Sequence, residues 1–377
     1  MQPSMATPMW QFKPRTPNRG DTVRNPVVRE AIARLWENHP DFTELDLHNQ
    51  QLSDGDVSAL SAALAQNGYV TTLNLARNKI GAAGATALAD ALFCNTVVTE
   101  LDLSHNFIGA GGVQMLACTL LSNGSLATLK LGANQIDNWA AKQLADALEQ
   151  YVGLVELDLA NNQISATGAL MLASVFARNG GSARLGLAGN WLGDQGAAQL
   201  ASGFKIGDLA GPEGALELDL RATYLGDAAA QSLAQALAEN VRIGVLRLGG
   251  NHIGAEGARS LGEALDRNRR LRRLELASNH LGDAGVHWLA GGLARNVGMQ
   301  ALDLGQNGIG DSGALALLAT LSGNEALAAL DLRDNRIEYD AATYLLRELA
   351  SRPGFMLRLD GNPFITPDFL LGRTGAS

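Results

Sequence analysis

The sequence predicts an α/β fold, a right-handed solenoid with one parallel sheet on the concave face and helices on the convex face. Three regularities support this prediction. Leucine pairs of the form Leu-x-Leu recur about every 28 residues, an asparagine follows the first leucine of most pairs after five residues, and an Ala- and Leu-rich stretch of helical period comes next. Because strand and helix alternate at a fixed period, successive units stack strand on strand and helix on helix.

The leucine pairs open each unit and define about twelve units. Their spacing is 28 residues, except for 33 between units six and seven and 27 before the last unit. The first leucines of the pairs are Leu45, Leu73, Leu101, Leu129, Leu157, Leu185, Leu218, Leu246, Leu274, Leu302, Leu330 and Leu357. Each pair lies in an alternating segment such as Glu-Leu-Asp-Leu, which predicts a short strand with its leucines in the core. At about 4.8 Å per strand the sheet is on the order of 50 to 60 Å long, which suits a protein partner.

An asparagine follows most of the strands. Ten units carry it, at Asn78, Asn106, Asn134, Asn162, Asn190, Asn251, Asn279, Asn307, Asn335 and Asn362. An amide both donates and accepts, so it can satisfy the backbone groups that are freed where the chain turns out of a strand. We therefore expect a structural ladder and not a catalytic row. The Ala- and Leu-rich stretch that follows predicts a helix whose small residues allow close packing against the sheet.

Both ends of the chain differ from the repeat. Residues 1–24 contain four prolines, little periodic apolar content, and four lysines or arginines against Asp21, which predicts a flexible N-terminal arm. Residues 25–40 predict a capping helix that ends before Pro40. Its apolar stripe consists of Val28, Ile32, Leu35 and Trp36. The solenoid is predicted over residues 41–364, and residues 365–377 are predicted to form a C-terminal cap and tail.

The composition excludes several classes of protein. With 46% hydrophobic and 18% charged residues, the 377-residue chain is typical of ordered soluble proteins. No apolar run is long enough for a membrane span, and the N-terminus lacks the apolar core of a secretory signal, so we expect a cytoplasmic protein without a membrane partner. The net charge of -9 argues against nucleic acid as a partner. We also expect a monomer.

Neither catalysis nor a cofactor is indicated by the sequence. Cys94 and Cys118 are the two cysteines, and no CxxC pair or cluster of His and Cys residues accompanies them. A disulfide framework, a zinc site or another metal site is therefore not expected, and both thiols are predicted to be ordinary buried or half-buried residues. The Walker A, HExxH and GxSxG motifs are absent.

From about Thr43 to Phe364, the units resemble the leucine-rich repeats of ribonuclease inhibitor, NOD-like receptors and Ran GTPase-activating proteins. This resemblance implies a horseshoe that binds its ligand on the concave face or rim, and hence a non-catalytic scaffold for a protein partner. Two alternatives stay open. The polar, proline-containing arm before the repeats resembles that of bacterial effectors secreted into a host cell. A Ran-type GTPase-activating protein has similar repeats, but the long acidic tail of that family is missing.

Acidic pairs recur on every second strand, at positions that face away from the core. These pairs are Glu44/Asp46, Glu100/Asp102, Glu156/Asp158 and Glu217/Asp219. Successive pairs are about 10 Å apart, and they predict a negative track for a basic partner, with an attraction that weakens as salt rises. The alternative, which we favour, is that they resemble the family consensus and keep the sheet face soluble. An open surface offers no environment that separates two carboxyl pKa values, so catalysis by these pairs is not expected.

A second candidate site lies at the residue after the asparagine position, which is polar or small in most units. In four consecutive units it is Trp191, Tyr224, His252 and His280, and neighbouring strands supply Arg221, Arg247 and Arg273. Aromatic residues and arginine are enriched at binding hot spots. The same region holds an insertion of five residues within 204–216, and Thr223 replaces the asparagine. Units six to nine are therefore predicted to bind the partner. The alternative is that surface aromatic residues fill space over an imperfect repeat. A metal site at the two histidines is disfavoured, because no carboxylate or cysteine accompanies them.

Two weaker candidates complete the set. A run of arginines at one helix-to-strand turn is suited to an acidic segment, although such runs are more often solvated turns. The run consists of Arg267, Arg269, Arg270, Arg272 and Arg273. Trp139 stands alone in a loop where other units carry glycine, alanine or polar residues.

Overall fold

The computed structural model describes residues 23, 25–151, 153–178, 183–206, 215–239, 242–349 and 352–363. The predicted N-terminal arm lies outside these residues except for Val23, and so do residues 207–214 of the segment 204–216 that holds the predicted insertion. The predicted C-terminal cap and tail also lie outside them. The described helices are α1 (Pro26–Glu37), α2 (Asp54–Leu64), α3 (Ala82–Cys94), α4 (Gly109–Leu120), α5 (Asn138–Leu148), α6 (Ala166–Arg178), α7 (Gly193–Ile206), α8 (Asp227–Ala238), α9 (Ala255–Leu265), α10 (Gly282–Leu293), α11 (Asp311–Leu321) and α12 (Tyr339–Leu349). The described strands are β1 (Glu44–Asp46), β2 (Thr72–Asn74), β3 (Glu100–Asp102), β4 (Thr128–Lys130), β5 (Glu156–Asp158), β6 (Ala183–Gly186), β7 (Leu216–Asp219), β8 (Ile243–Arg247), β9 (Arg273–Glu275), β10 (Ala301–Asp303), β11 (Ala329–Asp331) and β12 (Met356–Arg358).

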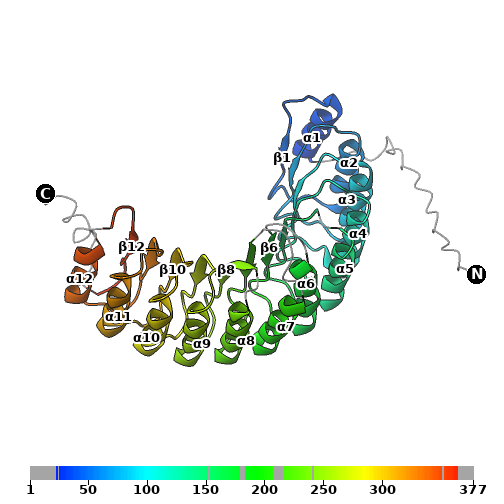
Figure 1. The fold of residues 1–377 in the computed structure, drawn as a ribbon. Helices are drawn as coiled ribbons and strands as arrows, with labels where there is room; N and C mark the ends of the chain where they lie inside the picture. The colour runs from blue at the N-terminus through cyan, green and yellow to red at the C-terminus, as the bar shows by residue number, and fades with distance from the viewer. Residues whose placement is uncertain are drawn as a thin grey trace, which may run out of the picture.

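The strands form one parallel sheet in chain order from β1 to β12. Figure 1 shows an open, curved array with the strands on the inner side and the helices on the outer side. The predicted α/β solenoid is therefore confirmed. Because helices are wider than the spacing of hydrogen-bonded strands, stacking one of each per unit bends the array toward the sheet.

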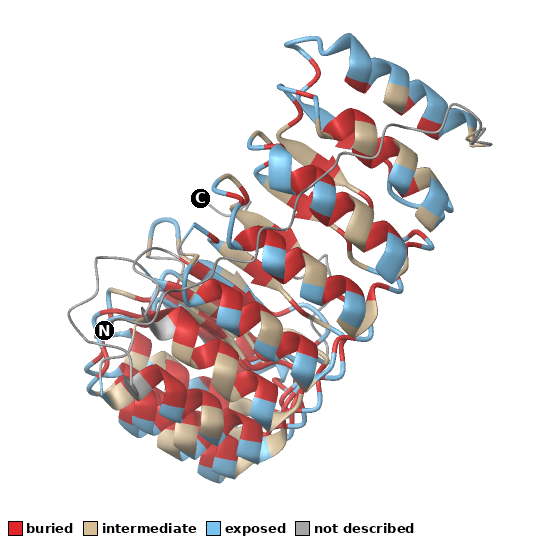
Figure 2. Ribbon diagram, turned by 90° about the vertical axis from the view of Figure 1, so that its right-hand side faces the viewer, coloured by how far each residue is buried: buried red, intermediate tan, exposed pale blue. Residues whose placement is uncertain are grey.

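Leucines align from strand to strand and build the core. Leu45 of β1 pairs with Leu73 of β2, and Leu302 of β10 pairs with Leu330 of β11. These side chains are at most 6% exposed. The register shifts once, between β7 and β8 at Leu216, beside the spacing irregularity. In Figure 2 buried and exposed residues alternate along the helices, which places the helical apolar residues against the same core.

The predicted asparagine ladder is confirmed by its hydrogen bonds. In unit nine, Nδ2 of Asn279 donates to the carbonyls of Leu248 and Leu276 at 2.9 Å each, and Oδ1 accepts the backbone N–H of Ile253 at 3.0 Å. One buried amide therefore ties its own strand end to two backbone groups of the preceding unit. Such groups are costly to leave unpaired in a buried turn.

A second asparagine row, which the sequence analysis missed, lies where each helix leads to the next strand. Its described members are Asn67, Asn95, Asn123, Asn268, Asn296 and Asn324, all buried. Nδ2 of Asn296 donates to the carbonyls of Leu265 and Asn268 at 2.6 and 2.8 Å. Tyr151 stands at the same position of its unit, and its hydroxyl donates to the carbonyl of Leu126 at 2.7 Å. The two rows therefore join neighbouring units at both ends of each strand.

A third link between units joins helix to helix. Oδ1 of Asp283, in the first turn of α10, accepts the backbone N–H groups of Gly310 and Gly313 at 2.7 and 3.0 Å. A carboxylate at a helix N-terminus satisfies free N–H groups and complements the helix dipole. A Cβ atom on Gly313 would lie 2.7 Å from that oxygen, so glycine is required for this contact.

Helix α1 covers the first unit as the sequence predicts. Val28 and Leu35 are buried in it, and Asn25 caps its N-terminus by accepting the N–H of Val27. Trp36 was placed wrongly on the buried stripe, because 53% of it is exposed. Among the described residues, no helix combines the length and apolarity needed to cross a membrane.

Thr223 interrupts the ladder, and this makes the contribution of one amide measurable. Its hydroxyl donates to the carbonyl of Leu220 at 2.6 Å, but no hydrogen bond joins its side chain to Leu187 or Leu192 of the preceding unit. We expect Thr223→Asn to supply both bonds and to raise the free energy of unfolding by about 1 kcal/mol. The reverse change one unit on, Asn251→Thr, should lower it by about 1 to 3 kcal/mol. Urea denaturation of both variants checks this, and equal effects of the same sign would contradict it.

Candidate partner-binding surface

Three rows of side chains cover the concave face. The first row precedes each leucine pair, the second lies between the two leucines, and the third follows the pair, because successive strand residues point to opposite faces. Glu156 and Asp158 of unit five occupy the first and second rows, and Arg221 of unit seven occupies the third. The predicted acidic pairs and the predicted arginines therefore share one surface.

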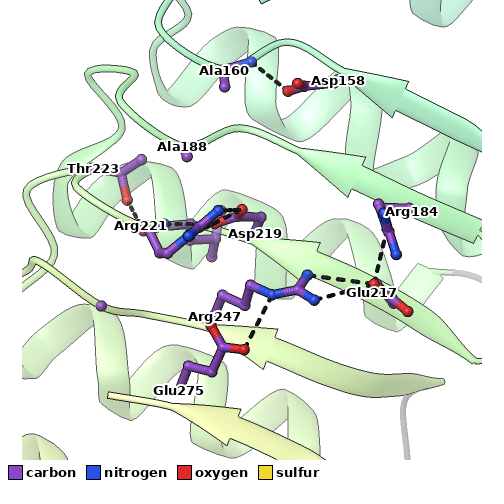
Figure 3. Close-up of polar contacts among 12 residues, drawn as sticks. Asp158, Ala160, Arg184, Ala188, Glu217, Asp219, Arg221, Thr223, Arg247 and Glu275 are labelled. Atoms are coloured by element: carbon purple, nitrogen blue, oxygen red, sulfur yellow. Dashed lines mark hydrogen bonds and ion pairs between the residues drawn. The ribbon is translucent and has the colours of Figure 1, made fainter. Parts of the chain in front are cut away.

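In units six to nine, the carboxylates on this surface are matched by arginines. Nε of Arg184 lies 2.9 Å from Oε2 of Glu217, and the guanidinium of Arg247 contacts Glu217 at 3.4 Å and Glu275 at 3.3 Å. Figure 3 shows Arg184 and Arg247 converging on Glu217 from the two neighbouring strands. The carboxylate of Glu217 is thus held between two cations.

Two further ion pairs of these units each lie within a single unit. Nη2 of Arg221 is 2.6 Å from Oδ2 of Asp219, and Nε of Arg273 is 2.6 Å from Oε1 of Glu275. The hydrogen bond to Asp219 raises the pKa of Arg221. The predicted negative track therefore does not extend through unit seven. Sequence alone did not show this, because the pairing depends on which way each long side chain turns across the sheet.

The acidic pairs of units one to five have fewer cationic partners. Nζ of Lys130 lies 2.6 Å from Oε1 of Glu100, Glu156 has the more distant Arg184 at 3.5 Å, and Nδ1 of His48 lies 2.8 Å from Oδ1 of Asp46. Within the described part of the chain, Asp102 and Asp158 have no cation in ion-pair contact. Burial raises the pKa of Asp158, and the nearby charges of Asp219, Glu156 and Asp102 raise it further.

The predicted aromatic residues lie beyond the C-terminal ends of the strands, in the turns that lead from each strand to the next helix. Trp191 and Tyr224 are each 61% exposed, and both histidines are exposed. The rings of His252 and His280 stack with centroids 6.0 Å apart and an interplanar angle of 12°. The backbone N–H of Trp191 donates to the carbonyl of Ile164 and that of His252 donates to the carbonyl of Leu225, so these two turns are fixed to the preceding unit. We call these four residues the aromatic edge.

The arginines predicted to accompany the aromatic edge form ion pairs with carboxylates instead. Arg221, Arg247 and Arg273 contact acidic residues of the concave face, and the described cation–π contacts involve other residues. Phe107 was not among the predicted site residues, although it follows Asn106 in unit three and is 58% exposed. It stands at the same position of its unit as Trp191 and Tyr224, so the position after the asparagine also predicts its exposure.

The remaining predictions concern the arginine run, the two thiols, Trp139 and a metal site. In the arginine run, Arg269 and Arg272 donate to the backbone carbonyls of Asp266 and Gly298, which gives these two side chains a structural contact. The prediction of buried or half-buried thiols was wrong, because Cys94 and Cys118 are both exposed on their helices. Trp139 is 46% exposed at the start of α5. The described residues contain no group of three or more His, Cys, Asp or Glu side chains placed to hold a metal ion.

Asp158 gives the surface a measurable dependence on pH. Its raised pKa means that ionisation costs more in the folded chain than in the unfolded chain, so this side chain lowers stability above its folded pKa. That cost disappears as the pH falls below the ordinary value of 3.8. We expect Asp158→Asn to stabilise the protein at pH 7, by an amount that shrinks toward pH 4, because the amide still accepts the N–H of Ala160. Thermal denaturation at both pH values checks this. Asp219→Asn serves as the contrast and should destabilise, since it leaves Arg221 unpaired.

Several solved structures share features of this fold. Actin-binding site 2 of leiomodin-1 is 24% identical, with a TM-score of 0.37, and the match covers 40% of this chain and 87% of that chain. The tropomodulin C-terminal domain of Caenorhabditis elegans is 19% identical, with a TM-score of 0.37 and coverages of 40% and 92%. An internalin of Listeria monocytogenes is 17% identical, with a TM-score of 0.46 and coverages of 91% and 96%. At these identities and TM-scores, the likenesses carry no information about function.

A family model described as Leucine Rich repeat matches six segments of the chain. The segments are residues 66–89, 94–117, 154–173, 245–262, 267–287 and 298–318. No curated protein sequence gives a significant match. The family model does not distinguish the ribonuclease-inhibitor type, which stays a prediction. Segments on both sides of the irregular units match it, and all lie in stacked units of strand, turn and helix. The chain is therefore a leucine-rich repeat protein.

Proposed function

We propose that this protein is a non-catalytic scaffold that binds a protein partner, and that the partner contacts the aromatic edge of units six to nine. The observation that carries the proposal is the exposure of two large aromatic side chains, Trp191 and Tyr224, on adjacent units. Exposed aromatic side chains in one row are costly in water and stabilise a complex when they are covered. Tyrosine and tryptophan also dominate the energetics of protein interfaces.

The backbone supports this role because it holds the row in place before a partner arrives. The turns of Trp191, His252 and His280 donate hydrogen bonds to Ile164, Leu225 and Ile253 of the preceding units. A preformed surface loses little conformational entropy on binding, so more of the contact energy remains as affinity. The charge network of Glu217 and Arg247 lies on the same units and supplies a polar margin beside the aromatic edge.

The absence of catalysis is part of this proposal. On the concave face, the carboxylates of units seven and nine are held by arginines, and the remaining acidic pairs stand on an open sheet. General acid–base chemistry by carboxylates needs two environments that separate their pKa values, usually in a site that excludes water. The secreted-effector and Ran-type GTPase-activating alternatives stay predictions from sequence. So do the cytoplasmic location, the monomeric state and the absence of a nucleic-acid partner.

A double variant tests the aromatic edge. We expect Trp191→Ala with Tyr224→Ala to weaken binding by at least about 30-fold, since loss of one hot-spot aromatic alone costs about 2 kcal/mol or more. Wild type, the double variant and a control, Tyr344→Ala, serve as baits in parallel for quantitative mass spectrometry of cell extract. Tyr344 is 55% exposed on α12, away from the edge. A true partner is recovered by wild type and the control and lost from the double variant. Equal recovery by all three baits would remove this surface from the proposal.

A further inference from the structure

The aromatic edge belongs to a row of exposed turn positions that begins at the first unit. Hydrogen bonds join successive turns of this row, as where the N–H of Phe107 donates to the carbonyl of Ile80. Successive turns are therefore about 5 Å apart, the spacing of hydrogen-bonded backbone. From unit one to Trp191 of unit six the row covers about 25 Å. The members of the row before unit six are Gln51, Lys79, Phe107, Gln135 and Gln163, all exposed.

The N-terminal arm joins the array at the start of the same row. Nδ2 of Asn25 donates to the carbonyl of Gln50 at 3.0 Å, and Gln50 directly precedes Gln51, the first member of the row. Val23 is half-buried and packs against the core of the array. The chain that precedes Val23 therefore starts beside the row of turns in which Trp191 and Tyr224 lie.

The arm contains a short apolar stretch among its polar and basic residues. Both aromatic residues of the arm belong to it, and they are two positions apart. Residues two apart in an extended chain point to the same side, so both rings can contact one surface. Aromatic side chains stabilise a contact when they cover one another and leave water. The stretch consists of Pro8, Met9, Trp10, Phe12 and Pro14.

The length of the arm is sufficient to bring this stretch to the aromatic edge. Phe12 is thirteen residues before Asn25, and an extended chain of that length spans about 40 Å. Trp191 and Tyr224 lie about 25 and 30 Å along the row from its first turn, which is within that reach. A tether of this kind holds its end at an effective concentration of about 1 mM, far above the concentration of a second chain in dilute solution. The chain's own arm is therefore the favoured occupant.

We propose that residues 8–14 of the chain's own N-terminal arm lie against the aromatic edge, with Trp10 and Phe12 packed on Trp191 and Tyr224. This proposal rests on the proposed function, because it concerns the regulation of the same surface. A partner that binds the edge displaces the arm. With an effective concentration of about 1 mM and a Kd of about 0.1 mM for the separate arm, the arm lowers the affinity of a competitor about ten-fold.

Photo-cross-linking in the full chain tests the contact directly. The photoreactive amino acid p-benzoylphenylalanine replaces Phe12, and mass spectrometry locates the cross-links after irradiation. We expect cross-links to the turns that contain Trp191 and Tyr224. A mixture of isotopically light and heavy chains identifies the source, because an arm on its own chain joins peptides of one label. The absence of cross-links to these turns, or cross-links that join light to heavy chains, overturns the proposal.

A labelled synthetic peptide of residues 6–19 tests the competition. Fluorescence anisotropy compares its binding to the full wild-type chain and to a full-length arm variant, Trp10→Ala with Phe12→Ala. The peptide should bind the arm variant about ten-fold more tightly, because the edge is then uncovered. A peptide that carries the same two substitutions is the control and should bind neither chain. Equal affinity of the original peptide for both chains overturns the proposal.

Further substitutions in the arm variant locate the peptide. Adding Trp191→Ala and Tyr224→Ala should abolish peptide binding, whereas adding Tyr344→Ala, an exposed aromatic residue on α12, should leave it unchanged. Raising the salt concentration should not weaken an apolar contact. Equal losses from the two sets of substitutions overturn the proposed location. A steep loss of binding with salt also overturns it, because Lys13 and Arg15 then carry the interaction.

The bait experiment separates this proposal from the proposed function. The arm variant should recover more of the partner than wild type does, and the variant of Trp191 and Tyr224 should recover none. If wild type and the arm variant recover equal amounts and the edge variant none, the proposed function holds and the arm contact fails. If the edge variant still recovers the partner while cross-links map to the edge, the arm contact holds and the proposed function fails.

Discussion

The buried asparagine amide between neighbouring strands is the constraint on which the rest of the structure depends. A unit of one short strand and one helix cannot bury its own turn, and the turn leaves carbonyl and N–H groups that water cannot reach. Each amide satisfies groups of two successive units, as Asn251 does for Leu220 and Leu225 on one side and Leu248 on the other. Stability thus resides in the junctions between units, and every junction repeats the same chemistry.

This arrangement leaves the outward positions free to vary. Leucines and asparagines satisfy the core and the turns, so the residues after them on the edge have no shared structural role. Between the two leucines, an aspartate such as Asp102, Asp158 or Asp303 accepts the backbone N–H two residues on, but the fold does not require this bond in every unit. Glutamate, lysine, glycine and arginine all occur in the second-row or first-row positions without changing the fold. Where the core chemistry itself changes, at Thr223, the neighbouring edge positions are occupied by Trp191 and Tyr224. The leucines and asparagines therefore keep the fold regular, while the residues at the outward positions make the surface differ from unit to unit.

The sequence predicted the fold because the period of the leucines and asparagines reports one repeated local environment. It predicted the exposure of Trp191 and Tyr224 for the same reason, since their position in the unit fixes the direction of the side chain. The second asparagine row escaped notice because it lies between helix and strand, outside the motif used to align the units. Ion pairing was not predictable either. Whether Arg247 turns toward Glu217 and Glu275 depends on side-chain rotamers and on neighbours in other units, which no short pattern encodes.

In the proposed scaffold role, the acidic pairs of units one to five and the aromatic edge would act on different steps of binding. Charge attracts a basic partner over about one Debye length, near 8 Å at physiological salt, and so changes mainly the rate of association. Desolvated aromatic contacts form only on close approach, and so change mainly the rate of dissociation. The two surfaces lie on different units, and substitutions at sites without shared contacts are usually additive in free energy. In an array of stacked units, the residues that change the rate of association and those that change the rate of dissociation can therefore lie on different units. Substitutions at one set then leave the other rate largely unchanged.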